Sequence, residues 1–237
     1  MSDSKNISMI STSILPGDVI AYAADNGITI TDIPFIDVTL TNDGAVIEEI
    51  KELGQKNITA IFTSLNGINA VINHLTAKPN WQVYCMDGVS KPAAIKFFGE
   101  TALAGTASNA AQLGERVIEN NKASSVVFFC GNKRLADLPV TLHKAGIELK
   151  EIEVYNTVKT PHIIEDKSYN AIAFFSPSAV ESFFEVNEMP ADVTIFTVGQ
   201  TTANKINEHC NNKVVISIKP GKENLVKTVI EYFKRAI

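Results

Sequence analysis

The sequence contains no long hydrophobic stretch and no excess of basic residues. Its purely apolar runs, such as residues 126–130, reach only about five residues, whereas a membrane-spanning helix needs about 20. With 21 basic and 26 acidic residues the net charge is −5, and the basic residues form no cluster. A general nucleic-acid-binding surface would need such a cluster. We therefore expect neither a membrane protein nor a nucleic-acid-binding protein.

The common nucleotide-binding and hydrolase motifs are also missing. The 13 glycines are never separated by two, four or five positions, which excludes G-x-G-x-x-G, G-x-S-x-G and the Walker A loop. The four histidines are widely spaced and stand in no H-E-x-x-H motif, so we expect no metal site. No nucleophile–base pair or paired carboxylates can be picked from spacing. This favours a reaction that needs little side-chain chemistry.

Cysteine is scarce. Cys85, Cys130 and Cys210 are odd in number and far apart, which is not the pattern of a disulfide framework. The first 15 residues carry one lysine and a weak apolar stretch interrupted by serine, unlike a secretory signal. Both observations favour a cytoplasmic protein.

The chain does contain a regular alternation of short β-branched or aromatic runs with helical patterns. Its composition, 45% hydrophobic and 20% charged, is that of an ordinary globular protein. The alternation predicts an α/β fold built from parallel βα units. Residues 29–38 form one expected strand. Residues 92–98 and 107–120 form consecutive expected helices, with no strand predicted between them.

An internal repeat indicates two similar halves. Residues 61–64 resemble residues 174–178, and residues 84–88 resemble residues 196–199. The offset is 112 from Ser64 to Ser176 and 111 from Gly88 to Gly199. The segment before residue 36 supplies only one βαβ unit and the segment from about residue 160 supplies three strands, so neither makes a full sheet alone. We therefore predict two parallel-sheet α/β domains, one of them built from these two segments. The discontinuous domain comprises residues 1–35 and 160–237, the inserted domain residues 41–150, and the extended hinge segments residues 36–40 and 151–159.

Small polar residues follow the ends of five expected strands. In a parallel sheet these ends meet at one edge, where the amides of the following helices point outward and bind anions. We therefore predict a site for carboxylates or phosphates. The alternative for any one loop is that Ser, Thr and Asn only cap their own helices. The five loops are residues 63–66, 88–91, 131–134, 176–178 and 199–202.

Several of these loops stand within a recognisable order of motifs. The motifs are Phe62-Thr63-Ser64 with Asn69-Ala70-Val71, Gly131-Asn132-Lys133-Arg134 to Gly146, Val154-Tyr155-Asn156-Thr157, Phe175-Ser176-Pro177-Ser178-Ala179-Val180, and Gly199-Gln200-Thr201-Thr202-Ala203. In this order the sequence resembles the uroporphyrinogen-III synthase family along essentially its whole length. Each motif is weak alone, so their order and the inserted-domain layout carry the resemblance.

The resemblance implies an enzyme of haem and other tetrapyrrole biosynthesis. The family cyclises hydroxymethylbilane, a linear tetrapyrrole with eight carboxylates, to uroporphyrinogen III, with loss of water and inversion of ring D through a spiro intermediate. Because this substrate closes unaided to the wrong isomer, the main task is to hold a productive conformation. The resemblance implies a monomer that needs no cofactor and touches the preceding pathway enzyme only transiently.

The resemblance also implies roles for individual residues. Tyr155 is the expected catalytic residue, a phenol that protonates or hydrogen-bonds the leaving hydroxyl. Its alternative is a tyrosine that packs the hinge. The expected substrate-binding residues are Thr63, Ser64, Asn66, Gly88, Lys91, Gly131, Arg134, Ser176, Pro177, Ser178, Gly199, Thr201 and Thr202.

The sequence departs from the family pattern in two places. Residues 9–13 lack the Arg-Pro pair that commonly ends the first strand, and Lys91-Pro92 replaces the usual threonine-alanine helix start. Two other functions therefore stay open: a non-catalytic cytoplasmic binder of a small polycarboxylate, and an inactive member of the family.

Overall fold

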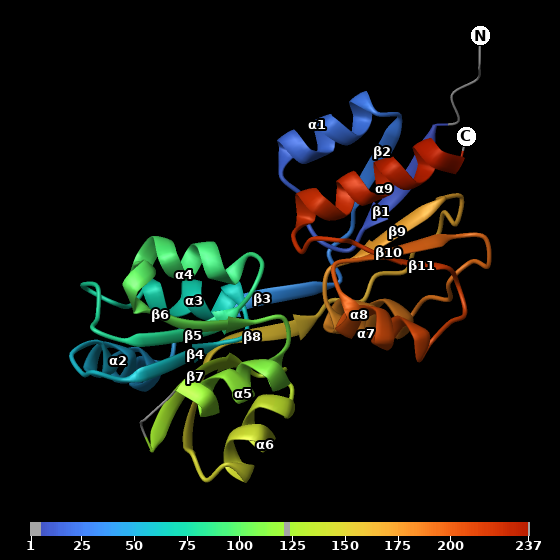
Figure 1. The fold of residues 1–237 in the computed structure, drawn as a ribbon. Coiled ribbons are helices and arrows are strands. Elements are labelled where there is room, and N and C mark those ends of the chain that lie inside the picture. The colour runs from blue at the N-terminus through green and yellow to red at the C-terminus, as the bar shows by residue number, and fades with distance from the viewer. Residues whose placement is uncertain (1–5, 121–123, 237) are drawn as a thin grey trace. The chain divides into compact units, whose positions relative to one another are not determined.

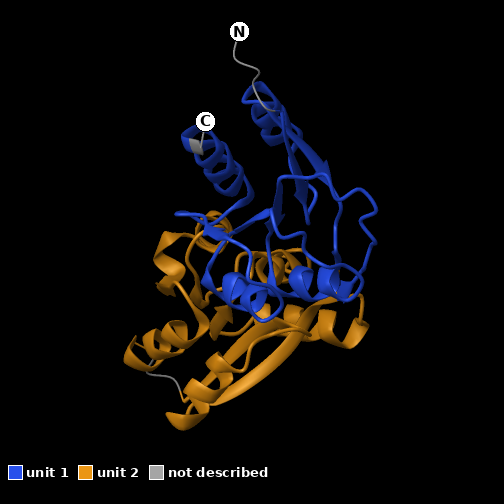
Figure 2. Ribbon diagram, turned by 90° about the vertical axis from the view of Figure 1, so that its right-hand side faces the viewer, with its two compact units in different colours: residues 1–37, 158–237 blue, residues 38–157 orange. Residues whose placement is uncertain are grey.

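The computed structural model describes residues 6–120 and 124–236, and the chain divides into two α/β units. Residues 1–37 and 158–237 form unit 1, and residues 38–157 form unit 2 (Figure 2). The chain passes from one unit to the other within two strands, β3 (Ile36–Leu40) and β8 (Glu148–Lys159), which are neighbours in one sheet. The predicted α/β class is confirmed.

The sheet of unit 1 has the strand order β11-β10-β9-β1-β2, and each neighbouring pair is parallel. Helices α1 and α9 pack on one face and α7 and α8 on the other (Figure 1). The elements are β1 (Ile7–Ser11), α1 (Gly17–Asp25), β2 (Ile28–Asp32), β9 (Ala171–Phe174), α7 (Pro177–Phe184), β10 (Thr194–Thr197), α8 (Gln200–Asn207), β11 (Val214–Ile216) and α9 (Lys222–Ala236).

Successive side chains of the inner strands enter opposite cores of unit 1. In β1, Met9 lies in the core that contains Val229 of α9, whereas Ile10 lies in the core that contains Phe183 of α7. A sheet covered on both faces needs apolar residues at every position, which is why β9 reads Ala-Ile-Ala-Phe without alternation.

The sheet of unit 2 has the order β3-β8-β7-β4-β5-β6, and its strands are parallel from β8 to β6. Helices α2, α3 and α4 cover one face, and α5 and α6 the other (Figure 1). The further elements are α2 (Gly44–Gly54), β4 (Thr59–Phe62), α3 (Leu65–Ile72), β5 (Gln82–Met86), α4 (Ser90–Phe98), a 3-10 turn (Glu100–Ala102), β6 (Leu103–Ala107), α5 (Ala110–Asn120), β7 (Ser125–Gly131) and α6 (Asp137–Lys144).

Stacked aromatic rings fill the core of unit 2 under α2 to α4. The rings of Phe62 and Phe129 are 5.3 Å apart between centroids, and Trp81 lies 5.4 Å from Phe129. The indole N–H of Trp81 donates to the carbonyl of Leu53, 3.0 Å away. This bond satisfies the one polar atom of a buried ring.

Two details of the secondary structure differ from the prediction. Residues 29–38 form two strands, β2 and β3, because Pro34 between them has no amide hydrogen for a sheet ladder. Strand β6 was not expected, since Leu103–Ala107 is rich in Ala and Gly. Gly105 is needed there: an added Cβ would lie 3.0 Å from the buried Tyr84 ring.

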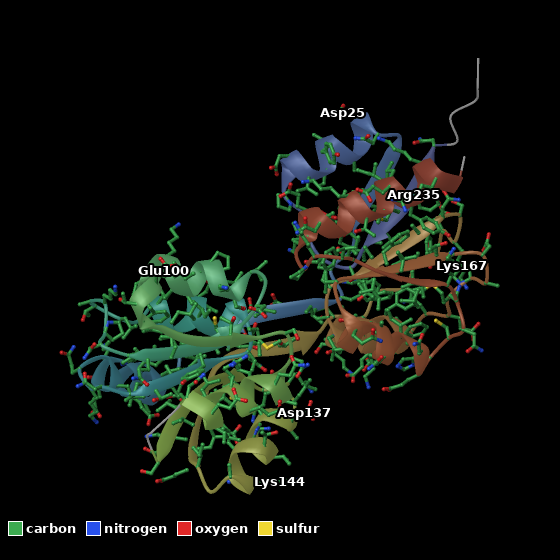
Figure 3. The ribbon with its side chains drawn as sticks, in the orientation of Figure 1. Asp25, Glu100, Asp137, Lys144, Lys167 and Arg235 are labelled. Carbon is green, nitrogen blue, oxygen red and sulfur yellow. The ribbon has the colours of Figure 1, made fainter. Side chains whose placement is uncertain are left out.

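Charged side chains lie on the outside of both units. The labelled residues of Figure 3 are all exposed: Asp25, Glu100, Asp137, Lys144, Lys167 and Arg235. Across residues 6–120 and 124–236, no helix combines the length and the apolar character that a membrane crossing demands.

Candidate active site

Each sheet has one pair of neighbouring inner strands that are followed by helices on opposite faces. In unit 1 these strands are β1 and β9, followed by α1 and α7; in unit 2 they are β4 and β7, followed by α3 and α6. We call each pair a switch point. The loops that leave a switch point diverge, and ligands of parallel α/β sheets bind there, beyond the carboxyl ends of the strands.

Tyr155 lies at the switch point of unit 2. The ladder between β7 and β8 shifts after Cys130, so that Gly131 pairs with Tyr155. Such an irregularity re-aims a side chain at the end of a strand. A Cβ added at Gly131 would lie 2.9 Å from Cδ2 of the Tyr155 ring and closer still to two other ring atoms. The ring therefore occupies the space that any side chain at position 131 would need.

The surroundings of Tyr155 keep its phenol protonated. Burial raises its pKa above the ordinary value of 10, a hydrogen bond with the Ser64 side chain opposes the rise, and the neighbouring Cys130 adds to it. On the other side of the ring, a Cβ added at Gly67 of α3 would lie 3.7 Å from Cε1. A neutral phenol held in this way is a proton donor at neutral pH.

Ser64 also holds the first turn of α3. Its Oγ accepts the amide hydrogen of Asn66 at 3.1 Å, which is an N-cap bond. Thr63 and Asn66, on either side, are half-buried. The hydroxyl of Ser64 therefore both caps a helix and hydrogen bonds with Tyr155.

The loop after β7 is tied to β8 by side chains. Asn132 accepts the amide hydrogen of Thr157 at 2.9 Å and donates to the carbonyl of Thr157 at 3.3 Å. Arg134, predicted to supply positive charge to a substrate, donates from Nη2 to Oε1 of Glu151 at 2.9 Å. Its charge is therefore already compensated by a neighbouring carboxylate.

The loop after β5 is more open. Gly88 has φ of +78°, a conformation that glycine adopts readily. Val89, which precedes the first turn of α4, makes no side-chain bond to that turn, and Lys91 in the turn is exposed. The amide hydrogens of this helix end therefore lack a side-chain acceptor from the capping residue, which suits an anion.

Unit 1 repeats this arrangement. Ser176 caps α7 by accepting the amide hydrogen of Ala179 at 3.2 Å, and Pro177 and Ser178 follow in its first turn. Gly199 precedes α8 without a side-chain cap bond, as Val89 does before α4. In the first turn of α8, Thr201 is exposed whereas Thr202 is only 3% exposed. The hydroxyl of Thr202 therefore points away from solvent, unlike that of Thr201.

One charged residue at the switch point of unit 1 was not predicted. Lys222 begins α9 and donates from Nζ to the carbonyl of Ile14, in the loop after β1, at 2.7 Å. Its Nζ lies 5.9 Å from the centre of the Phe175 ring, which follows β9. The sequence carried one signal for it, a lysine at the first position of a helix that follows a strand.

Within the part of the chain that the structure describes, no three His, Cys, Asp or Glu side chains gather closely enough to hold a metal ion. The polar groups described at the two edges are mainly hydroxyls, backbone amides, the phenol of Tyr155 and the cations of Lys91, Arg134 and Lys222. This donor set suits carboxylates more than it suits a cation.

Comparison with known proteins places these features in a family. Residues 18–227 match the family described as uroporphyrinogen-III synthase HemD. Among solved structures, a mutant uroporphyrinogen III synthase from Thermus thermophilus is similar, with a TM-score of 0.69 at 14% identity, covering 97% of this chain and 98% of that one. The uroporphyrinogen-III synthetase from Helicobacter pylori has a TM-score of 0.63 at 18% identity, with coverages of 95% and 99%. No curated protein sequence matches significantly.

Proposed function

Because the chain belongs to the uroporphyrinogen-III synthase family, we propose that it cyclises hydroxymethylbilane to uroporphyrinogen III, with loss of water and inversion of ring D. The observation that carries the proposal is the protonated phenol of Tyr155 at the switch point of unit 2, beside Ser64 and Gly131. Two arguments support the proposal: the family membership, and a proton-donating phenol at a switch point, where ligands of parallel α/β sheets bind.

In the proposed reaction Tyr155 acts on the leaving hydroxyl. Its Oη hydrogen bonds to the terminal hydroxyl of the substrate and passes a proton to it, so that water departs. The pyrrole N–H returns a proton to the phenolate, which leaves an azafulvene and restores the phenol. The substituted carbon of ring D then attacks, and the resulting spiro intermediate fragments and recloses. These later steps follow from the reactivity of the substrate, provided that the protein holds the chain in a productive conformation.

We propose that backbone amides, more than hydroxyls, bind the acetate and propionate arms. The Oγ atoms of Ser64 and Ser176 are engaged by the first turns of α3 and α7. The first turns of α4 and α8 have no side-chain cap, and each helix end carries partial positive charge. Gly88 and Gly199 allow a carboxylate to approach these amides closely.

A coupled isomer assay tests the proposal. Hydroxymethylbilane is generated in place, the protein is added, and the oxidised products are separated into isomers I and III by chromatography. We expect isomer III to dominate, whereas the reaction without protein gives isomer I. Isomer I alone, from a sample whose folding is verified by thermal unfolding, would contradict the synthase function and favour the binding or inactive alternatives.

A further inference from the structure

The switch point of unit 1 carries a lysine whose place is determined by the fold. Residue 222 begins α9, which packs with α1 on one face of the sheet, so its side chain reaches the loop between β1 and α1. There Nζ donates to the carbonyl of Ile14 at 2.7 Å. Phe175, 5.9 Å from Nζ at its ring centre, follows β9. The ammonium therefore contacts the loops of both strands of the switch point.

Lys222 differs in its partners from most other lysines of the chain that form a hydrogen bond or an ion pair. Lys159, Lys205 and Lys227, for example, each pair with one or more glutamates at 2.5 to 3.5 Å. Among the residues that the structure describes, no carboxylate oxygen lies within 4.0 Å of Lys222. Its acceptor, the Ile14 carbonyl, is neutral, which leaves two N–H bonds of the ammonium for a further acceptor.

One acidic residue, Asp32, acts on Lys222 from the end of β2. Burial lowers the pKa of Lys222, and the charge of Asp32 opposes that change. Oδ2 of Asp32 accepts the amide hydrogen of Leu15 at 2.9 Å, whereas Oδ1 is buried without a partner among the described residues. Asp32 and Lys222 thus bind the same loop: Asp32 accepts the amide hydrogen of Leu15, and Lys222 donates to the carbonyl of Ile14.

Apolar surface lies beside the ammonium. Ile14 is 66% exposed, although it is a large aliphatic residue, and the Phe175 ring is half-buried. A cation next to exposed apolar side chains fits a carboxylate that is carried by a hydrophobic ring.

We propose that Lys222 binds a carboxylate arm of a tetrapyrrole at the switch point of unit 1, with Ile14 and Phe175 against the pyrrole that carries the arm. The proposal rests on the proposed function, because it assigns a ligand contact within that site. Strand β1 and the residues that directly follow it contain no basic residue. Lys222, from the last helix, would supply the positive charge at the carboxyl end of this strand.

The test measures binding of uroporphyrin III, a stable octacarboxylate, by isothermal titration to wild type and to Lys222→Met. We expect the variant to bind about tenfold more weakly, the loss of one charge-assisted bond. Lys222→Arg keeps the charge and should bind within about threefold of wild type. The matched control is Lys227→Met, on the same helix and paired with Glu223, which should leave the affinity unchanged.

A second variant separates ligand binding from a purely structural role. If Lys222 only balances Asp32, then Lys222→Met lowers the melting temperature while the affinity stays within twofold, and the proposal fails. Asp32→Asn keeps an acceptor for Leu15 and removes a competing negative charge, so we expect it to bind uroporphyrin III more tightly, about threefold. Weaker binding by Asp32→Asn would also overturn the proposal.

Failure of the proposed function gives a different result. If wild type makes isomer III but Lys222→Met shows unchanged affinity and KM, the synthase stands and the role of Lys222 falls. If wild type makes only isomer I but binds uroporphyrin III in a Lys222-dependent way, the synthase function falls and the role of Lys222 in binding stands. Titration with propane-1,2,3-tricarboxylate is a further arm: Lys222-dependent binding of that acid, with no binding of uroporphyrin III, contradicts a tetrapyrrole ligand.

Discussion

The two units resemble each other in the loops at the carboxyl ends of their strands, but they place different side chains there. Ser64 and Ser176 stand 112 residues apart and both cap a helix, and the uncapped helices α4 and α8 follow in the same order. At the switch point, however, unit 2 holds a phenol from its last strand, and unit 1 holds an ammonium from its last helix. The repeated fold supplies uncapped helix N-termini twice, whereas Tyr155 and Lys222 come from elements that do not correspond between the units.

The largest expected effect comes from removing the phenol of Tyr155 at the switch point of unit 2. Tyr155→Phe should lower kcat by about 100-fold or more, the usual scale of general acid catalysis, and change KM by less than about threefold. Because the pKa of Tyr155 is raised above 10, it stays protonated as the pH rises from 7 to 9, so its loss of a proton should not lower the wild-type rate in that range.

The control for Tyr155→Phe is Tyr22→Phe, which removes an exposed hydroxyl from α1 of unit 1 and should leave kcat unchanged. Full turnover by Tyr155→Phe would remove the acid role. Equal losses in the two variants would point to a nonspecific effect of the substitution.

The second comparison pairs the glycines at the two edges. Gly131→Ala places a Cβ inside contact distance of the Tyr155 ring, so we expect a loss of about 2 kcal/mol in the free energy of unfolding and a lower kcat. At Gly199 nothing lies within 4 Å of an added Cβ and the backbone is extended, so Gly199→Ala should cost less than about 1 kcal/mol. Urea denaturation of both variants measures the difference. Equal losses in the free energy of unfolding would show that the Tyr155 ring can move aside at little cost.

The third comparison pairs the capping serines. Ser64→Ala and Ser176→Ala should each lower stability by about 1 kcal/mol, because each leaves an amide hydrogen at a helix start without its acceptor. Only Ser64→Ala should also lower kcat, since Ser64 alone of the two is bonded to Tyr155. Thermal unfolding and the isomer assay on the same samples separate the two effects. Matching kcat values for the two variants would contradict a contribution of Ser64 to Tyr155.

The smallest expected effect is on the reactivity of the three cysteine thiols, and we expect their modification to leave the activity unchanged. Burial raises the pKa of Cys85 to about 12 and that of Cys130 to about 11, so both stay protonated and covered at pH 8. Cys210 of unit 1 is half-buried. We expect a disulfide reagent to modify one thiol per native chain and three after unfolding. Rapid reaction of a second thiol in the native protein would show that unit 2 opens more readily than its core implies.

Much of the fold followed from local pattern because both sheets are covered on two faces. The sequence predicts strands at residues 7–11 and 82–86, and β1 and β5 have these same ends. Strand β6 was missed because three of its five residues are Ala or Gly, which are rare in strands. Gly105 leaves room for the Tyr84 ring, a long-range packing requirement that the local sequence does not reveal.

The candidate site was less predictable for the same kind of reason. The loop positions could be listed from strand ends, and a serine cap such as that of Ser64 is a local feature. The contact of Ser64 with Tyr155 and the pairing of Arg134 with Glu151 instead depend on residues farther along the chain. Lys222 lies 208 residues from its acceptor Ile14. No spacing rule connects such residues, so only the folded sheet order brings them together.

The pairing of β1 with β9 also determines when each unit can form. Met9 is aligned with Ala171, and Ser8 accepts a hydrogen bond from Asn170 across 161 intervening residues. During synthesis the whole of unit 2 emerges before β9 exists, so unit 2 can fold as soon as β8 is made, while β1 and β2 wait without sheet partners. Once unit 2 is folded, its compact body shortens the effective loop that joins β2 to β9, which lowers the entropy cost of closing unit 1. The inserted unit thus acts as a folding aid for the unit that encloses it in sequence.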